Sequence, residues 1–247
     1  MNTKESSRID TAMVLAAGFG TRMRPLTERI PKPLVTLAGR PLIDHALDRL
    51  AEAGIARAVV NVHHLADQIE AHLRGRAAPR IIISDERGKI LETGGGVRNA
   101  LPLLGPAPFI VHNSDSVWSE SGCSNLDALT GAFDEERMTA LLLLAPRASS
   151  LGYDGMGDFH RDATGQLQRR CKGEKAAYVF AGVSILQPRL FEGVGDAAFS
   201  LNVIFDRASA EGALFGSVLE GTWMHVGTPQ ALLEAESYLN EGRRLTA

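Results

Sequence analysis

Short apolar runs alternate along this chain with segments whose apolar residues recur at helical spacing, and this alternation limits the possible folds most strongly. Apolar runs with the length of buried strands lie at 12–17, 58–62, 80–84, 109–112 and 139–145. Helical spacing lies between them, at 41–50, 65–73, 96–104 and 126–133. Such an order builds a mostly parallel sheet with helices on both faces, so we expect an α/β fold.

The alternation becomes irregular after about residue 145. Strand-like runs at 178–186 and 213–219 and helical patterns at 201–210 and 229–239 no longer follow one another strictly. We therefore expect hairpins to extend the sheet, which becomes mixed. The chain of 247 residues is predicted to form a flexible tail, 1–9, and one domain, 10–247.

Composition excludes several classes of protein. With 26 Lys and Arg against 29 Asp and Glu, the net charge of −3 provides no global field for nucleic acid or an acidic membrane. No apolar run reaches the roughly 18 residues of a membrane span, and the polar start lacks the apolar core of a signal peptide. Cys123 and Cys171 form no CxxC motif, which favours a reducing cytoplasm.

The first apolar run leads into the glycine turn Gly18-Phe19-Gly20. A glycine turn after a buried strand exposes backbone N–H groups that can cradle phosphate oxygens, and glycine lets the backbone approach them. Arg22 adds a forked donor, and Lys32 adds an ammonium group between two prolines that stiffen its backbone. The third glycine of GxGxxG and the Walker pattern are both absent, so we expect a polyphosphate site of another kind.

The motif LAAGFGTRMRPLT followed by PKPL resembles the signature of the sugar-1-phosphate nucleotidyltransferases, and the similarity runs from about Met13 to the last predicted helix. This resemblance implies a Rossmann-like nucleotide-diphospho-sugar transferase fold with a mixed, mostly parallel sheet. It also implies the reaction, in which the phosphate of a sugar 1-phosphate attacks the α-phosphorus of a nucleoside triphosphate and pyrophosphate departs. Arg22 would then hold the β- and γ-phosphates, and Lys32 the α-phosphate.

The resemblance assigns the nucleotide to the half at about 10–145 and the sugar to the half at 146–247. Glycines at 94–96 resemble a base-reading loop, although on their own they would indicate a flexible helix cap. Glu92 stands where several relatives have an amide, so the base stays open. The predicted nucleotide-binding residues are Leu15, Ala16, Ala17, Gly18, Gly20, Thr21, Arg22, Met23, Lys32, Thr93, Gly94 and Gly95.

A metal site is predicted at Asp115, which follows a buried strand at the sheet edge where α/β proteins bind ligands. Arg22, Lys32 and Asp115 are the predicted catalytic residues. His225 stands where relatives commonly carry a second aspartate, in Trp-x-Asp-[Val/Ile]-Gly-Thr. Imidazole suits Mn²⁺, Co²⁺ or Zn²⁺ better than Mg²⁺. We therefore expect Mg²⁺ or Mn²⁺ as cofactor, with His225 a metal ligand, a contact to phosphate or metal-bound water, or a sign of lost activity.

Acceptor residues follow from the same resemblance. Glu174 and Lys175 are similar to a pair that meets the sugar and its phosphate, and the strand edge at Ala181 and Gly182 would lie under the ring. The predicted sugar-phosphate residues are Asn113, Asp158, Glu174, Lys175, Ala181, Gly182 and Asn202.

Among compact members, the chain is most similar to the N-acetylmuramate-1-phosphate uridylyltransferases of bacterial cell-wall recycling. UTP and N-acetylmuramic acid 1-phosphate are therefore the expected substrates. Mannose-1-phosphate guanylyltransferase and glucose-1-phosphate nucleotidyltransferase activities stay open, as does a silent nucleotide-sugar sensor. Small-molecule substrates are the expected partners, for a monomer or a homodimer.

Overall fold

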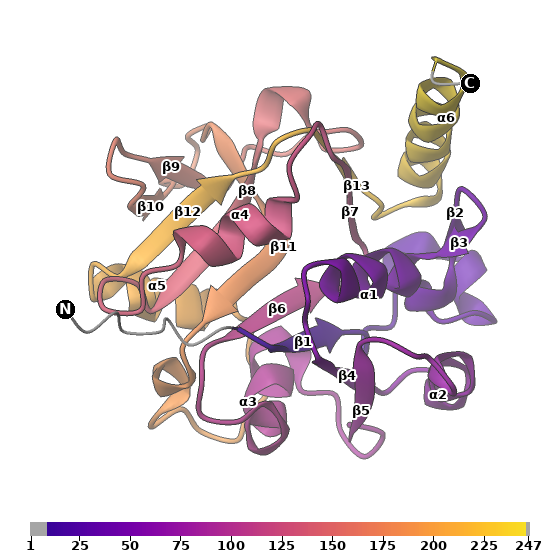
Figure 1. Ribbon diagram of the computed structural model, residues 1–247, viewed down its shortest axis with the longest axis horizontal. Coiled ribbons are helices and arrows are strands. Elements are labelled where there is room, and N and C mark those ends of the chain that lie inside the picture. Colours follow the sequence, from indigo (N-terminus) through magenta and orange to yellow (C-terminus); the bar gives the residue numbers. More distant parts are fainter. Residues whose placement is uncertain (1–8, 246–247) are drawn as a thin grey trace.

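A nine-stranded sheet runs through both halves of the chain and forms the middle layer of the fold (Figure 1). The structure is a computed structural model that describes residues 9–245. The strands are β1 (Thr11–Leu15), β4 (Arg57–Val62), β5 (Arg80–Asp85), β6 (Phe109–Asn113), β8 (Ala140–Pro146), β9 (Phe159–Arg161), β10 (Leu167–Arg169), β11 (Tyr178–Leu186) and β12 (Leu214–Val218). Their main order is β10-β9-β11-β6-β1-β4-β5, with β8 beside β11 and β12 beside β8.

Parallel pairing dominates the N-terminal part of the sheet. β1 lies between β4 and β6, and β5 extends the parallel array at the edge. These strands consist of apolar runs because both of their faces are covered: Val14 packs on one side of the sheet and Met13 on the other. The carboxyl ends of β1, β4, β5 and β6 consequently meet along one edge.

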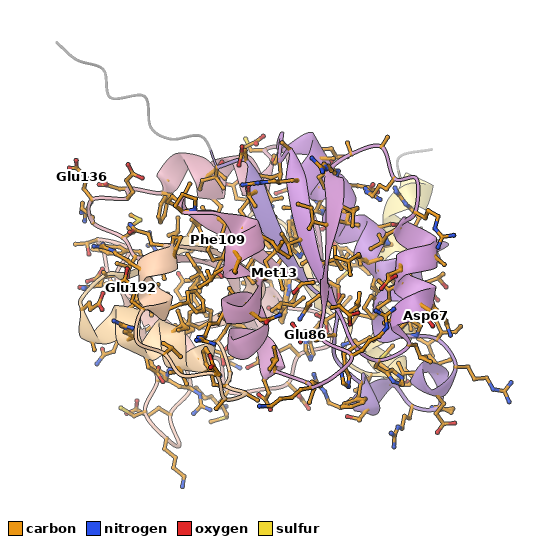
Figure 2. The ribbon with its side chains drawn as sticks, turned by 90° about the horizontal axis from the view of Figure 1, so that it is seen from below. Met13, Asp67, Glu86, Phe109, Glu136 and Glu192 are labelled. Carbon is orange, nitrogen blue, oxygen red and sulfur yellow. The ribbon has the colours of Figure 1, made fainter. Side chains whose placement is uncertain are left out.

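Helices cover the two faces of the sheet. On one face lie α1 (Leu42–Glu52), α2 (Ala66–Leu73) and α4 (Asn125–Ala132), and on the other lie α3 (Glu92–Leu104) and α5 (Asn202–Ala210). The last helix, α6 (Pro229–Leu245), stands at the periphery in Figure 1 and packs through Leu232 and Ala235 on a separate small cluster. Figure 2 shows Met13 and Phe109 in the middle of the molecule, whereas Asp67, Glu136 and Glu192 lie on its outside.

Antiparallel strands complete the sheet, as the irregular second half predicts. β11 runs antiparallel to both β6 and β8, and β9 and β10 form a hairpin beside it. The pairing of β11 with β8 shifts register between Phe180 and Ser184, and Gly182 within this bulge has φ 82°. The bulge lies where β11 passes the end of β6.

Two small sheets and several short helices lie outside this frame. β7 (Ser116–Ser119) pairs with β13 (Thr222–His225), and β2 (Thr36–Leu37) pairs with β3 (Arg40–Pro41). The 3-10 helices are η1 (Thr21–Met23), η2 (Leu26–Glu28), η3 (Lys32–Leu34), η4 (Arg147–Ser149) and η5 (Pro188–Phe191). The β7–β13 pair, which joins segments about 100 residues apart, sets His225 beside Ser116.

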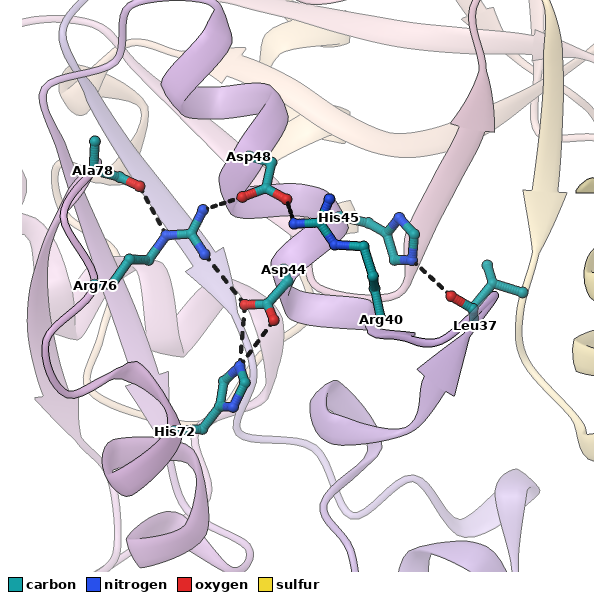
Figure 3. Close-up of polar contacts among 8 residues, drawn as sticks. All are labelled: Leu37, Arg40, Asp44, His45, Asp48, His72, Arg76 and Ala78. Atoms are coloured by element: carbon teal, nitrogen blue, oxygen red, sulfur yellow. Dashed lines mark hydrogen bonds and ion pairs between the residues drawn. The ribbon is translucent and has the colours of Figure 1, made fainter. Parts of the chain in front are cut away.

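A polar network ties α1 to the segment that follows α2 (Figure 3). The guanidinium of Arg76 pairs with Asp44 at 3.2 Å and also with Asp48, which pairs in turn with Arg40. His72 contacts the same Asp44 carboxylate at 3.0 Å. Because Arg76 lies four residues before β5, the network fixes the chain where it enters that edge strand.

The α/β fold with a mixed sheet is confirmed, and most predicted elements agree with the structure within two residues. Two boundaries are wrong. The last helix, α6, ends at Leu245 rather than at Leu239, and α3 begins at Glu92 rather than at Gly96, so the glycines at 94–96 lie inside its first turns. Residues 1–8 of the predicted tail fall outside the described residues. Within 9–245, no helix has both the length and the apolar character needed to cross a membrane.

Candidate active site

A pocket of about 220 Å³ lies at the carboxyl ends of β1, β4, β5 and β6. This is the edge where open α/β sheets bind their ligands. It is lined by Leu15, Ala16, Ala17, Gly18, Gly20, Lys32, Pro33, Asn61, Glu86, Ile90, Glu92, Thr93, Asn113, Ser114 and Asp115. The structure therefore brings together several predicted nucleotide residues with Asn113 and Asp115.

The loop after β1 presents unused backbone donors to this pocket. Within the described part of the chain, the N–H groups of four consecutive residues, Ala17 to Gly20, donate to no protein acceptor. Ala17 is buried and Gly20 half-buried, whereas Gly18 and Phe19 are exposed. Consecutive free N–H groups in a turn after a strand form a concave site that suits an anion.

Glycine is required at one of the two predicted positions for a steric reason. Gly20 has φ 61°, and a Cβ there would lie 2.9 Å from Lys32 Cβ. Thr27 closes the same turn by donating its hydroxyl hydrogen to the Gly20 carbonyl at 2.8 Å. In contrast, a Cβ at Gly18 would meet no atom within 4 Å, so this residue faces open space.

Lys32 and Asp115 face each other across the pocket and form an ion pair. The side chain of Lys32 is only 12% exposed, and it begins η3, between Pro31 and Pro33. Burial alone would raise the pKa of the Asp115 carboxyl, but the charge and hydrogen bond of Lys32 outweigh it and lower that pKa below its ordinary value. Asp115 is thus a carboxylate at neutral pH.

His225 joins this group from β13. Its Nε2 lies 3.5 Å from a terminal nitrogen of Arg22, and its ring lies against Trp223 and Tyr153. Burial lowers the pKa of His225 below its ordinary value; Asp115 opposes this shift, while Arg22 and Lys32 reinforce it. The imidazole is therefore neutral at neutral pH and carries a lone pair.

The predicted residues Arg22, Lys32, Asp115 and His225 consequently form one cluster. A single carboxylate with phosphate and water oxygens suits Mg²⁺, so Asp115 fits a divalent cation that arrives with a polyphosphate. Among the described residues, no group of three or more His, Cys, Asp or Glu side chains is arranged to hold a metal by itself. The donor set therefore fits a cation shared with a substrate.

Asn61 and Glu86 form the opposite wall, and the sequence analysis missed both. Asn61 Oδ1 accepts a hydrogen bond from Ala16 N at 2.8 Å, and its Nδ2 donates to Glu86 Oε1 at 2.9 Å. The second carboxyl oxygen of Glu86 has no partner within the described residues, although it is buried. Burial raises the pKa of Glu86, against the effect of the Asn61 hydrogen bond.

Signals for both residues were present in the sequence. Asn61 interrupts an otherwise apolar strand, and Glu86 lies two residues beyond the strand predicted at 80–84. The rule that ligands bind at the carboxyl ends of parallel strands applies to Glu86 as it does to Asp115.

The glycines at the start of α3 have a packing role in the structure. The N–H groups of Gly94 and Gly95 both donate to the Phe199 carbonyl, at 2.8 and 3.1 Å, and a Cβ on Gly94 would lie 2.4 Å from the Phe199 ring. Of the predicted base-reading residues, only Thr93 lines the pocket, and its hydroxyl accepts a hydrogen bond from Leu201 N at 2.9 Å. These glycines therefore bring α3 against the segment before α5 and lie behind the pocket wall.

Thr21 and Met23, also predicted for the nucleotide, differ from their neighbours in the loop. Together with Arg22 they form η1, and all three lie beside the pocket rather than in its lining. Thr21 is exposed, whereas Met23 is fully buried in the cluster beneath α6. The Met23 side chain is consequently a core residue.

The predicted acceptor residues fall into separate places. Gly182 touches Asn113, since a Cβ there would lie 3.1 Å from Asn113 Nδ2, and the Ala181 carbonyl accepts a hydrogen bond from Ser116. Asp158 accepts a hydrogen bond from Phe180 N at 2.9 Å. Asn113, Ala181, Gly182 and Asp158 therefore lie close together beside the first half of β11, and of these four only Asn113 lines the pocket.

The other acceptor candidates lie further out. Glu174 and Lys175 are exposed on the loop before β11, where Glu174 accepts a hydrogen bond from Cys171 N at 3.3 Å. Asn202 begins α5 and accepts a hydrogen bond from Arg169 at 3.2 Å. The structure does not bring these three side chains into contact with Asn113 or Asp115.

Comparison with known proteins agrees with this geometry. The sequence model of the Nucleotidyl transferase family matches residues 11–242, so the chain belongs to that family and is a nucleotidyltransferase.

Particular relatives are similar over nearly their whole length. The N-acetylmuramate alpha-1-phosphate uridylyltransferase of Caulobacter vibrioides is 51% identical over 93% of this chain and 97% of its own. The protein of the same name from Neisseria meningitidis is 36% identical over 92% and 96%. The solved inositol-1-phosphate CTP transferase from T. maritima has the same fold, with a TM-score of 0.75 and 18% identity over 95% of this chain and 98% of that one.

Proposed function

We propose that this protein joins UTP to N-acetylmuramic acid 1-phosphate, giving the UDP-sugar and pyrophosphate, in the recycling of bacterial cell-wall sugars. The row of free N–H groups from Ala17 to Gly20, facing Lys32, is the observation that carries the proposal, because it fits a triphosphate. The names of the two uridylyltransferase relatives support the choice of base and sugar.

The reaction needs positioning and charge more than acid–base chemistry. An oxygen of the sugar phosphate bonds to the α-phosphorus of UTP, the bond from that phosphorus to the β-bridging oxygen breaks, and pyrophosphate leaves with the electron pair. A phosphate monoester is already anionic at neutral pH, so no general base is required. Lys32 would steady the α-phosphate, and Arg22 with the N–H groups would hold the departing end.

A divalent cation, Mg²⁺ or Mn²⁺, would neutralise charge on the triphosphate when bound. Asp115 is the residue of this chain that would hold it, with phosphate and water oxygens completing the coordination. The neutral imidazole of His225 lies 3.5 Å from Arg22. Because Arg22 would hold the phosphates, His225 would contact the phosphates or a metal-bound water. We propose the same site for either ion.

Glu86 would contribute to reading the base. Glu86 lines the pocket and has one carboxyl oxygen without a partner among the described residues, and uracil presents one N–H donor, at N3, to which such an oxygen can be the acceptor. Thr93 would close the other side of the base. The nucleotide would thus contact mainly residues 10–145, and the acceptor sugar mainly residues 146–247.

The cellular setting belongs to the proposal as well. Cys123 and Cys171 are both exposed and unpaired, which suits a reducing cytoplasm. We propose a monomer or homodimer that acts there on small molecules.

The test is a substrate matrix. Purified protein receives UTP, GTP, CTP or dTTP with N-acetylmuramic acid, glucose or mannose 1-phosphate and Mg²⁺ or Mn²⁺, and pyrophosphate release is measured. We expect the highest kcat/KM for UTP with N-acetylmuramic acid 1-phosphate. Nucleotide binding without pyrophosphate release would instead identify a sensor, and preference for GTP and mannose 1-phosphate would reject the proposal.

A matched pair of variants tests the role of Lys32. Lys32→Met removes the ammonium group and should lower kcat by about 100- to 1,000-fold, the usual cost of losing one donor that stabilises transition-state charge. Arg189→Met removes an exposed cation on η5, outside the pocket, and should leave kcat unchanged. Comparable rates for Lys32→Met and the wild type would refute the role.

A further inference from the structure

Two arginines converge on neighbouring backbone carbonyls at the acceptor side of the site. Arg147 Nε donates to the Ala176 carbonyl at 3.2 Å, and Arg170 Nε donates to the Gly157 carbonyl at 2.6 Å. These carbonyls belong to touching segments, because a Cβ on Gly157 would lie 2.5 Å from the Ala176 oxygen. The two guanidinium groups are therefore fixed in adjacent places by the backbone.

Neither guanidinium has an acidic partner among the described residues. A terminal nitrogen of Arg170 also donates to the carbonyls of Cys171 and Glu174, at 3.3 and 3.4 Å. Both terminal nitrogens of Arg147 are free of partners among the described residues. The nearby acid, Asp158, accepts a hydrogen bond from Phe180 N and pairs with neither arginine. Two half-buried like charges without a counter-ion are unfavourable, so this arrangement favours binding of an anion.

Tyr153 connects this pair to the reaction centre. Its hydroxyl accepts a hydrogen bond from Gly157 N at 3.1 Å, and its ring centre lies 6.1 Å from that of His225, the neighbour of Arg22. Burial, assisted by Asp158, raises the pKa of Tyr153 despite the two arginines, so the phenol keeps a hydrogen that it can donate.

Strand directions place the pair at the same edge as Asp115. β8 and β6 both run antiparallel to β11, so the carboxyl ends of β8 and β6 and the start of β11 share one edge. Arg147 directly follows β8, and Ala176 lies two residues before the start of β11. A sugar whose phosphate lies near Asp115 can therefore extend toward the arginines.

We propose that Arg147 and Arg170 bind a carboxylate carried by the acceptor sugar and so select a sugar acid phosphate. This inference rests on the proposed function and deepens it, because muramic acid differs from glucosamine by a lactyl ether that ends in a carboxylate. Guanidinium forks match carboxylates in shape and charge. An acceptor that lacks the carboxylate leaves both cations unpaired, which penalises it.

The experiment compares two acceptors with UTP in one set of variants. Arg147→Met should lower kcat/KM for N-acetylmuramic acid 1-phosphate by about 10- to 100-fold, the range for a lost charge-assisted hydrogen bond. For N-acetylglucosamine 1-phosphate, the kcat/KM of Arg147→Met should stay within about twofold of the wild-type value, as is usual for surface substitutions. Arg147→Lys keeps the charge but lacks the forked guanidinium. Its kcat/KM for N-acetylmuramic acid 1-phosphate should therefore lie between those of the wild type and Arg147→Met.

Arg161→Met is the matched control, because Arg161 Nε also donates to a backbone carbonyl, that of Gly216, at 2.8 Å on the hairpin β9–β10. Arg161→Met should leave kcat/KM unchanged for both acceptors. An equal loss on both acceptors in Arg147→Met would assign Arg147 to the shared phosphate or to the fold and overturn the carboxylate site, as would no loss at all.

Failure of the proposed function gives a different pattern. A wild type that transfers uridylyl groups to N-acetylglucosamine 1-phosphate but not to N-acetylmuramic acid 1-phosphate rejects both the function and the carboxylate site. A wild type that uses N-acetylmuramic acid 1-phosphate, with variants that do not discriminate between the acceptors, rejects the carboxylate site alone.

Discussion

Glu86 lines the pocket, and the burial of its carboxyl group lowers the unfolding free energy at neutral pH. Its carboxyl is 3% exposed, one oxygen is held by Asn61 and the other is unpartnered. Its pKa is raised by burial, so the folded state holds a proton at pH values where the unfolded chain has released it. The unfolding free energy therefore decreases as the pH rises from the ordinary glutamate pKa through the raised one.

Glu86→Gln should remove this penalty. At pH 7 the variant should unfold at a higher urea concentration than the wild type, and the difference should vanish below the ordinary pKa of 4.5, where both side chains are neutral. Its KM for UTP at pH 7 should rise by about tenfold, since a carboxyl group that would accept the uracil N–H becomes an amide. Urea unfolding at pH 7 and pH 4 measures the first effect, and a variant less stable than the wild type at both pH values would contradict it.

At the scale of elements, the contact between α3 and the segment before α5 shapes the wall of the pocket at Thr93. Two N–H groups of α3 donate to the Phe199 carbonyl, and the Thr93 hydroxyl accepts a hydrogen bond from Leu201 N. This close approach requires glycine because the space beside Gly94 is occupied by the Phe199 ring.

Gly94→Ala should therefore lower the unfolding free energy by about 1–3 kcal/mol, the usual cost of overpacking. Gly131→Ala in α4 is the control, because a Cβ there meets no atom within 4 Å, and it should gain about 0.5–1 kcal/mol from helix propensity. Denaturant titration of both variants checks the pair. Equal stability of the two would show that α3 tolerates a wider separation from Phe199.

At the scale of the whole molecule, the site draws residues from both ends of the chain. Arg22 and Lys32 follow β1, Asp115 follows β6 and His225 ends β13. A ligand that contacts all of them binds only the folded chain, and such a ligand stabilises it.

UTP with Mg²⁺ at about 100 times its Kd should raise the Tm by about 5–10 °C. Lys32→Met should abolish most of that shift, because the α-phosphate loses its cation, whereas Arg189→Met should keep it. Thermal unfolding with and without ligand measures both. A full shift in Lys32→Met would show that the triphosphate binds without Lys32.

The sequence predicted what depends on local pattern. Apolar runs located β1, β4 and β11 closely, and the motif around Gly18 and Lys32 located one wall of the pocket. The roles of Gly94 and Gly95 could not be predicted, because the neighbour of a glycine is set by tertiary packing. The β7–β13 pair joins a four-residue strand in the middle of the chain to one near its C-terminal end, and such short segments have no periodicity of their own.

The direct contact between Lys32 and Asp115 has a consequence for the order in which ligands enter. Each group is the counter-ion of the other, so a lone divalent cation must displace an ammonium group and a lone inorganic phosphate must displace a carboxylate. A divalent cation already chelated by a nucleotide supplies both counter-charges, because the cation pairs with Asp115 while a phosphate pairs with Lys32. Binding of this complex therefore leaves neither side chain without an opposite charge. The ion pair therefore disfavours binding of a lone ion and favours the cation–nucleotide complex that we propose as the ligand.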